Sequence, residues 1–196
     1  MIVVLLMKLT GSYQINADKQ KVWEALNDPE ILKQAIPGCE EFKKNSDTEF
    51  TATATNKIGP FNASFTGDIE LKDIDAPNSY KIIGSGNSPV GFASGEADVK
   101  LEDINGETNL IYTVEANVGG KIAQVGSRLI DMTAKKMADI FFGKFSDLVS
   151  VKEEPKEIKA ENNKAEAPVT KKSKVNIYIY AVVAILASII IGYFFT

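Results

Sequence analysis

Residues 61 to 72 alternate strictly between two kinds of side chain, and this alternation constrains the fold more than any other feature. Small or apolar residues occupy every second position from Phe61 to Leu71, and polar residues occupy the positions between them. Because successive side chains of a β-strand point to opposite faces, this segment predicts a strand with one buried face. The same period predicts strands at 50–58, 93–102 and 110–118, and shorter strands are expected at 7–15, 39–44 and 79–85.

Helices are expected before and after these strands, and Asn105-Gly106 is typical of a hairpin turn between the last two long strands. Residues 18–26 and 29–36 have short helical patterns, and Pro37-Gly38 ends the second one. After Gly119-Gly120 we expect one continuous helix of about 28 residues that ends near Leu148. Its apolar sector contains Ile122, Val125, Leu129, Met132, Met137, Ile140 and Phe141. The order of elements predicts an α+β fold with an antiparallel sheet.

The inward strand positions are rich in Ala and Gly, whereas the long helix that faces them has a wide apolar sector. Two interpretations follow from this pattern. The sheet and the helix either enclose an apolar pocket, or the small residues let the helix pack close to the sheet. The pattern alone does not decide between them.

The composition excludes several classes of function. The chain has no His and one Cys, so it lacks imidazole bases, a disulfide and a thiolate set for zinc or an iron-sulfur cluster. Of its 22 basic and 26 acidic residues, seven Lys and five Glu fall within residues 151–196. Residues 1–150 therefore hold 15 basic and 21 acidic residues, a net charge of −6 that argues against nucleic acid as a partner.

Residues 175–195 contain no charged side chain, and this segment predicts a single transmembrane helix. Lys171, Lys172 and Lys174 precede it, which places the domain at residues 1–150 on the cytoplasmic side of a cell membrane. Between the two, residues 151–174 are rich in Lys, Glu, Pro and Ala and predict a disordered, charged linker. At the N-terminus, the apolar residues 1–6 either extend the first strand or precede a true start at Met7.

Four motifs resemble the family of the carbon monoxide dehydrogenase G subunit, a branch of the START-like helix-grip proteins. They are DPEILKQAIPGCE at 28–40, IGPFNASFTGDIEL at 58–71, GFASGEADVKLE at 91–102 and TVEANVGGKIAQVGSRLIDMTAKKMADIFFGKF at 113–145. The resemblance implies a seven-stranded antiparallel sheet that grips a long helix around an apolar cavity. It also implies an accessory protein without catalysis, which recruits a molybdenum-containing carbon monoxide dehydrogenase, or a related molybdenum hydroxylase, to the membrane. The resemblance further implies binding of a respiratory quinone such as menaquinone.

Under this fold, eight residues that the alternation and the helical wheel place inward are the candidate ligand-binding residues. They are Phe61, Phe65, Phe92, Tyr112, Ile122, Val125, Leu129 and Met132. The segment Gly84 to Gly91 is expected to be a flexible loop, which either gates the cavity or is an ordinary surface loop. No catalytic or metal-binding set is predicted.

Four further residues each allow two interpretations. Lys136 either hydrogen-bonds a ligand or extends to solvent, and Arg128 either pairs with Asp131 or contacts a partner. Phe142 falls in the polar sector, so it either touches a membrane or a partner, or lies at the edge of the core. Cys39 is expected to be a small buried residue without redox chemistry.

Three other functions remain open. One is a structural membrane tether with a filled core and no ligand, and another is a general lipid or isoprenoid carrier. The last is a START-like enzyme, such as a cyclase or hydrolase, which would need a buried carboxylate or Tyr in the pocket with a displaced pKa. The missing His argues against the enzyme.

Overall fold

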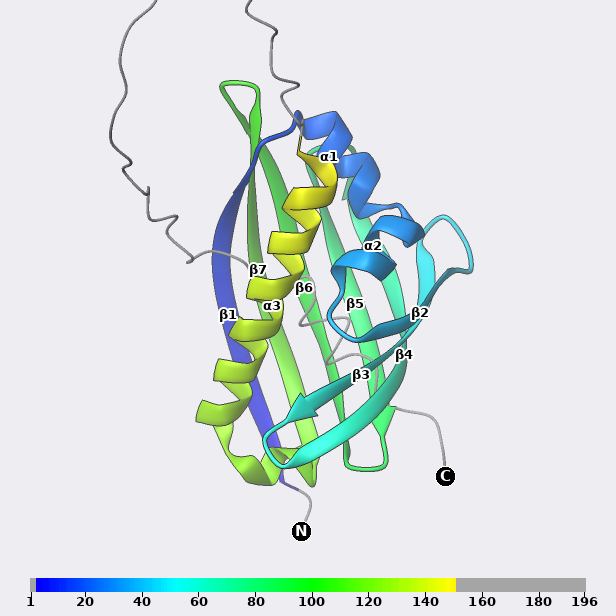
Figure 1. Cartoon of the computed structure of the whole chain (residues 1–196), viewed down its shortest axis with the longest axis vertical. Helices are drawn as coiled ribbons and strands as arrows, with labels where there is room; N and C mark the ends of the chain where they lie inside the picture. The colour runs from blue at the N-terminus through cyan, green and yellow to red at the C-terminus, as the bar shows by residue number, and fades with distance from the viewer. Residues whose placement is uncertain (1–2, 151–196) are drawn as a thin grey trace, which may run out of the picture.

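The computed structural model describes residues 3–150, which form a curved seven-stranded antiparallel sheet, one long helix and two short helices (Figure 1). The predicted linker at 151–174 and the predicted membrane segment at 175–195 lie outside the described residues. Within residues 3–150, no helix combines the length and apolar character needed to cross a membrane. The elements follow in the order β1 (Val4–Ile15), α1 (Lys19–Leu26), α2 (Pro29–Ala35), β2 (Cys39–Lys44), β3 (Glu49–Ile58), β4 (Phe61–Asp75), β5 (Ser79–Ser88), β6 (Gly91–Ile104), β7 (Glu107–Gly120), the 3₁₀ helix η1 (Ile122–Val125) and α3 (Ser127–Val149).

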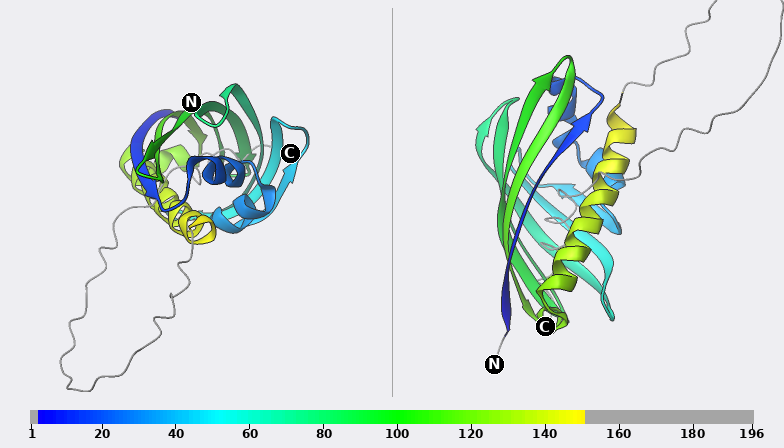
Figure 2. Two further views of the ribbon diagram at one scale, coloured as in Figure 1. Left: turned by 90° about the horizontal axis from the view of Figure 1, so that it is seen from above. Right: turned by 90° about the vertical axis from the view of Figure 1, so that its left-hand side faces the viewer.

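The strands are arranged in the order β1-β7-β6-β5-β4-β3-β2, and α3 lies along one face of the sheet, here called the inner face (Figure 2). The predicted alternation is confirmed, because most alternate residues of the long strands are buried on the inner face. The buried inner-face residues of β3, β4, β6 and β7 include Phe50, Ala52, Ala54, Ala63, Phe65, Ile69, Leu71, Ala93, Ala97, Val99, Leu101, Leu110, Tyr112, Val114, Ala116 and Val118.

The turn predicted between β6 and β7 is also confirmed. Asn105 and Gly106 adopt positive φ angles of 57° and 85°, as a two-residue hairpin turn requires. At the other end of β7, Val4 to Leu6 on β1 pair with Gly119 to Asn117. These apolar N-terminal residues therefore extend the first strand, which was one of the two interpretations of their sequence.

The two short helices begin where the sequence predicts. The Asp18 side chain accepts a hydrogen bond of 2.9 Å from the Lys21 backbone N–H, and Asp28 accepts one of 2.8 Å from that of Glu30. Each cap satisfies a backbone N–H that has no partner inside the helix. The helix α2 ends before Pro37 and Gly38, and Gly38 has a φ of 69°.

The prediction of one continuous helix after Gly119-Gly120 is wrong. The chain forms the short 3₁₀ helix η1, breaks at Gly126 with a φ of 90°, and only then begins α3 at Ser127. Gly126 permits this break because it has no Cβ to clash at positive φ. In consequence, η1 is a separate segment between Gly120 and Gly126, two glycines with positive φ.

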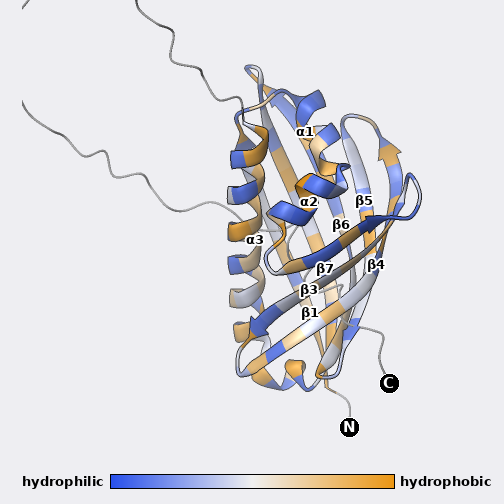
Figure 3. Cartoon of the chain, turned by 45° about the vertical axis from the view of Figure 1, so that its right-hand side comes forward, coloured by the Kyte–Doolittle hydropathy of each residue, from blue (hydrophilic) through white to orange (hydrophobic). Residues whose placement is uncertain are grey.

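The sheet-facing side of α3 also differs from the predicted sector, although the ribbon alternates between hydrophilic and hydrophobic residues as expected (Figure 3). Phe142, placed in the polar sector, is 1% exposed and stacks on Tyr13 of β1. It belongs to the core, so of the two interpretations of Phe142 the structure supports the core position and not the contact with a membrane or a partner. The buried residues of α3 are Ile130, Ala134, Met137, Ala138, Phe141, Phe142, Phe145 and Val149.

The loop predicted at Gly84 to Gly91 is mostly a strand. Residues 84–88 belong to β5 and pair with residues 91–95 of β6, and only Pro89 and Val90 form the turn. Gly and Ser have low strand propensity, but hydrogen bonding to neighbouring strands overrides that preference here. A long gating loop is therefore absent from this part of the described chain.

Candidate functional site

A small apolar void lies between the inner face of the sheet and the start of α3. Its volume is about 20 Å³, which is room for one water molecule. Nine residues from β3, β4, β6, β7, η1 and α3 line it: Ile58, Phe65, Ala93, Val118, Ile122, Ile130, Thr133, Ala134 and Met137. Thr133 contributes the one hydroxyl group of this lining, and the other eight side chains are hydrocarbon or thioether.

The size of the void bears on the two interpretations of the small inward residues. A site that encloses a small organic ligand usually measures at least about 300 Å³. In this structure the helix instead packs close to the sheet, as the second interpretation expected. A ligand of ordinary size would have to enlarge this space by moving the elements around it.

Two glycine turns of the sheet lie beside η1 and the start of α3. A Cβ atom on Gly59, in the turn between β3 and β4, would lie 3.0 Å from Leu129 Cδ2 and 3.4 Å from Val125 Cγ1. On the other side, a Cβ atom on Gly91 would lie 2.9 Å from Ile122 Cγ1. Two turns of the sheet thus touch η1 and the start of α3 through glycines.

Five of the eight candidate residues lie at this end of the molecule. Phe65 and Ile122 line the void and are 0% and 2% exposed. Phe61 and Val125 are partly buried and pack against the core, and Leu129 is half-buried beside Gly59. The structure therefore brings these five together, but their role in ligand binding stays a prediction.

Tyr112 is buried as expected, but it lies in a different part of the core. Its ring stacks at 5.8 Å from that of Tyr13 and 6.2 Å from that of Phe142, and it covers Gly11. Burial raises the pKa of Tyr112 to about 12, although a hydrogen bond with Tyr13 opposes the shift. This phenol stays protonated at neutral pH and does not line the void.

Two candidate residues do not face the interior, and the prediction of their orientation is wrong. Met132 is 60% exposed on α3. Phe92 precedes the inward Ala93 on β6, so its side chain points to the outer face, where its ring covers Gly119. Met132 was misplaced because the wide apolar sector did not show which part of it faces the sheet.

Sequence reasoning missed seven of the nine lining residues as site residues. Ala93, Val118 and Met137 were expected to face inward, but small or unremarkable side chains gave no reason to single them out. On the helical wheel Ile130 and Thr133 lie inside the predicted apolar sector but were not named in it, and Ala134 lies at its edge. Ile58 ends β3 beside a turn, where alternation gives little information.

The remaining candidates have ordinary surroundings. Lys136 and Arg128 are exposed, and Arg128 forms no ion pair with Asp131 among the described residues. Cys39 is half-buried, and its Sγ donates to the Glu41 carbonyl at 3.3 Å. Burial raises the pKa of the Cys39 thiol to about 11, so it is neutral and unreactive at physiological pH.

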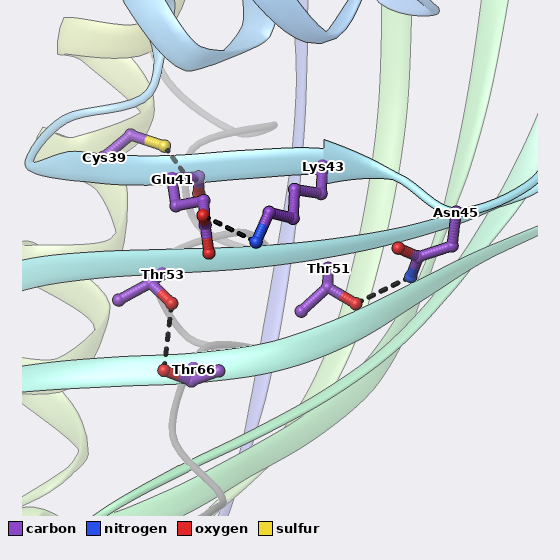
Figure 4. Close-up of polar contacts among 7 residues, drawn as sticks. All are labelled: Cys39, Glu41, Lys43, Asn45, Thr51, Thr53 and Thr66. Atoms are coloured by element: carbon purple, nitrogen blue, oxygen red, sulfur yellow. Dashed lines mark hydrogen bonds and ion pairs between the residues drawn. The ribbon is translucent and has the colours of Figure 1, made fainter.

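A larger, open hollow of about 590 Å³ is lined by Asn45 and by residues of β3, β4, β5 and β6, among them the charged side chains of Glu49, Asp68 and Glu70. Figure 4 shows polar contacts on β2, β3 and β4 beside this hollow: Asn45 donates to Thr51 Oγ1 at 2.7 Å, and the hydroxyls of Thr53 and Thr66 lie 3.0 Å apart. Thr51 in turn donates to Asp68 at 2.9 Å. These groups satisfy one another, and the hollow lacks the apolar enclosure of a ligand site.

Comparison with known proteins identifies the family and the fold. Residues 11–150 match the family model that describes the G subunit of carbon monoxide dehydrogenase (CoxG). Among solved structures, a conserved protein from Geobacillus kaustophilus is 30% identical with a TM-score of 0.70, over 73% of this chain and 95% of that chain. A search of the curated proteins finds no match.

Two more distant structures show the same START-like helix-grip fold. A putative uncharacterized protein from Rhizobium leguminosarum is 14% identical with a TM-score of 0.56, over 76% of this chain and 97% of that chain. The ZhuI aromatase/cyclase from Streptomyces sp. R1128 is 13% identical with a TM-score of 0.54, over 74% of this chain and 94% of that chain. At such identities the likeness concerns the fold alone. From the family match and the Geobacillus relative, we conclude that the chain belongs to the CoxG family, the family of the carbon monoxide dehydrogenase G subunit.

Proposed function

We propose that this protein is a membrane-anchored accessory protein that binds a respiratory quinone, such as menaquinone, between its sheet and α3. Its second role is to recruit a molybdenum-containing carbon monoxide dehydrogenase, or a related molybdenum hydroxylase, to the cytoplasmic face of the cell membrane. The proposal of quinone binding rests on the apolar lining of the void, which includes the one hydroxyl group of Thr133. The proposal that the protein recruits a dehydrogenase rests on its membership of the CoxG family.

The lining matches the chemistry of a quinone. Eight apolar side chains suit a hydrocarbon ring system and an isoprenoid chain, and Thr133 supplies one hydrogen-bond donor for a carbonyl oxygen. Because a quinone carbonyl only accepts hydrogen bonds, a hydroxyl is a suitable partner. No charged side chain belongs to the lining, so the site favours a neutral ligand.

Entry of the ligand requires the void to open, and η1 is the segment suited to move. It is joined to β7 through Gly120 and to α3 through Gly126, which have φ angles of 85° and 90°. Displacing η1 removes Ile122 from the lining and separates Val125 from Gly59. Apolar ligands would then enter between α3 and the turns of the sheet, where a membrane can deliver them.

Quinone binding is tested by substitutions that fill the void. Ala134 lines it and is 2% exposed, whereas Ala138, one turn further along α3, is 0% exposed and lies outside the lining. Ala134→Leu and Ala138→Leu add the same side chain to the same helix, so they are matched in overpacking. Full-length protein is incubated with vesicles that contain menaquinone, re-isolated and extracted. We expect the native chain and Ala138→Leu to take up quinone. We expect Ala134→Leu to take up little or none.

The tight packing of the void favours one competing function, a tether that binds no ligand. In that case the native chain takes up no quinone and the two variants behave alike. Recruitment of the dehydrogenase is tested separately by removing residues 175–196 from the chain in cells. We expect the dehydrogenase to move from the membrane fraction to the soluble fraction, and a dehydrogenase that stays at the membrane would contradict recruitment.

An enzyme is not favoured by the titratable groups of the described residues. Tyr80 and Tyr112 are buried and have raised pKa values, so both remain protonated at neutral pH and cannot serve as bases. Neither belongs to the lining of the void. The role we propose is therefore binding and recruitment without catalysis.

A further inference from the structure

The sheet is open, and its two edge strands differ in how they are protected from pairing with another strand. The edge strand β2 has only six residues, and its pairing with β3 is interrupted by a bulge between Cys39 and Glu41. Its exposed side chains are mostly charged, and Glu41 and Lys43 form an ion pair of 2.8 Å. Short length, a bulge and charges are the features that keep edge strands unpaired.

The other edge strand, β1, lacks this protection in its first half. It is twelve residues long, and within the described residues it pairs with β7 alone, without a bulge. From Val4 to Leu9 it carries one charged side chain, Lys8, which is paired with Glu115 on β7. A long regular edge with its charge neutralised leaves backbone N–H and C=O groups ready to pair with another strand.

Exposed apolar side chains accompany this edge on the outer face of the sheet. Val4 is 50% exposed and Leu6 is 60% exposed. Val4 lies opposite Gly119, and a Cβ atom on Gly119 would be only 2.3 Å from the Cε1 and Cζ atoms of Phe92. The Phe92 ring therefore occupies the space over Gly119 and extends the apolar surface from β6 towards Val4. Val4, Leu6 and Phe92 together form what we call the β1 patch.

We propose that two copies of this chain associate by antiparallel pairing of their β1 strands, with a two-fold axis that passes beside Leu6. This register places Leu6 opposite Leu6 of the second copy, and Leu5 opposite Met7. It places Lys8 opposite Val4, so no like charges face each other across the contact. The segment is thus complementary to itself on both faces of the joined sheet, as a two-fold contact requires.

The expected contact is small and the dimer is correspondingly weak. The paired segment from Val4 to Lys8 has five residues and is about 17 Å long. With the β1 patch it covers less than the roughly 800 Å² per partner of a standard stable interface. The association should therefore depend on protein concentration and increase where chains are confined together.

Cysteine cross-linking tests the register directly. In a Cys39→Ser background, Leu6→Cys places two thiols opposite each other across the axis, within reach of a disulfide. Thr10→Cys is the matched control, because Thr10 is also exposed on the outer face of β1 but lies four residues from the axis. Its thiol would be about 27 Å from its counterpart. Both full-length variants are treated with oxidised glutathione, and disulfide-linked dimer is measured over time on non-reducing gels.

We expect the Leu6→Cys chain to form the linked dimer at least about tenfold faster than the Thr10→Cys chain. Association through another part of the protein would not bring residue 6 next to its counterpart, so equal rates, or no linked dimer for Leu6→Cys, would overturn the proposal. In a second measurement, Leu6→Lys places two cations at the axis, and we expect it to abolish concentration-dependent association in sedimentation velocity. Circular dichroism verifies that each variant is folded, as its exposed position predicts. Unchanged association of Leu6→Lys would also overturn the proposal.

Discussion

Phe142 of α3 stacks on Tyr13 of β1, with ring centroids 4.0 Å apart and 22° between the ring planes. Both rings are buried, and Phe142 also meets Phe141 edge-on at 5.0 Å. This contact fixes the C-terminal half of α3 against the edge strand of the sheet. The opposite end of α3 lacks an aromatic contact of this kind among the described residues and borders the void.

Phe142→Ala should therefore destabilise the protein strongly. Loss of a fully buried aromatic ring costs about 3 to 5 kcal/mol of unfolding free energy. Ile140→Ala is the control on the same helix, since Ile140 is 38% exposed and its truncation should cost about 1 kcal/mol or less. Urea unfolding followed by the fluorescence of Trp23, the one Trp of the chain, measures both values. Equal destabilisation by the two variants would show that the stacking does not hold α3.

Gly11→Ala should destabilise the protein through Tyr112. A Cβ atom on Gly11 would lie 2.1 Å from Tyr112 Oη and 2.6 Å from its Cζ, and the ring is held by Tyr13 and Phe142. Overpacking of this kind costs about 1 to 3 kcal/mol. In the double variant Gly11→Ala/Tyr112→Phe the closest atom is gone, so part of the loss should be recovered. A double variant whose loss equals the sum of the two single losses would contradict this explanation.

Stability should decrease at high pH because of the same tyrosine. Burial raises the pKa of Tyr112 from the ordinary value of 10.0 to about 12, so the folded protein holds this proton more tightly than the unfolded chain. The resulting stability is fully present below pH 10 and is lost as the pH rises towards 12, by roughly 2 kcal/mol. The urea midpoint at pH 8 and pH 11 measures the loss. Tyr112→Phe should show a smaller difference between the two pH values, and an equal difference would assign the loss to other groups.

The break at Gly126 should control opening of the void. Its φ is 90°, and no atom lies within 4 Å of the position that a Cβ would occupy, so Gly126→Ala adds backbone strain without a steric clash. The strain destabilises by about 1 to 3 kcal/mol those conformations in which residue 126 keeps a positive φ, as it does in the closed structure. We therefore expect lower stability together with faster uptake of menaquinone from vesicles.

Gly106→Ala is the matched control for this substitution. Gly106 has a φ of 85°, also has no atom within 4 Å, and lies in the hairpin turn between β6 and β7. It should lose a similar amount of stability and take up quinone at the native rate. Faster uptake in both variants would mean that general loosening, rather than the Gly126 break, admits the ligand.

The fold was predictable because most strands are buried on one face only. The alternation in 61–72 or 110–118 survives in the structure, since each inward residue joins the core and the residues between them stay at the surface. The two short helices and the Asn105-Gly106 turn were predictable for a related reason, because each depends on a few adjacent residues. Local geometry and one-sided burial are the features that a single sequence records well.

The site was less predictable because it depends on how α3 is rotated against the sheet. The wide apolar sector accommodates several rotations, and the break at Gly126 also separates η1 from α3. As a result Met132 was placed inward, whereas Ala134 and Thr133 were overlooked. Phe92 was misplaced because its large apolar ring was counted as inward, although the alternation that places Ala93 inward puts the residue before it on the outer face, where the ring covers Gly119.

The most direct test of the proposed function is native mass spectrometry, with lipid extraction, of the full-length protein purified from its own membrane. We expect one quinone per chain in the native protein and in Ala138→Leu, and an empty Ala134→Leu chain that still purifies with the dehydrogenase. A native chain that carries no quinone, and acquires none from vesicles that contain menaquinone, would contradict the central claim that this fold holds a quinone between its sheet and α3.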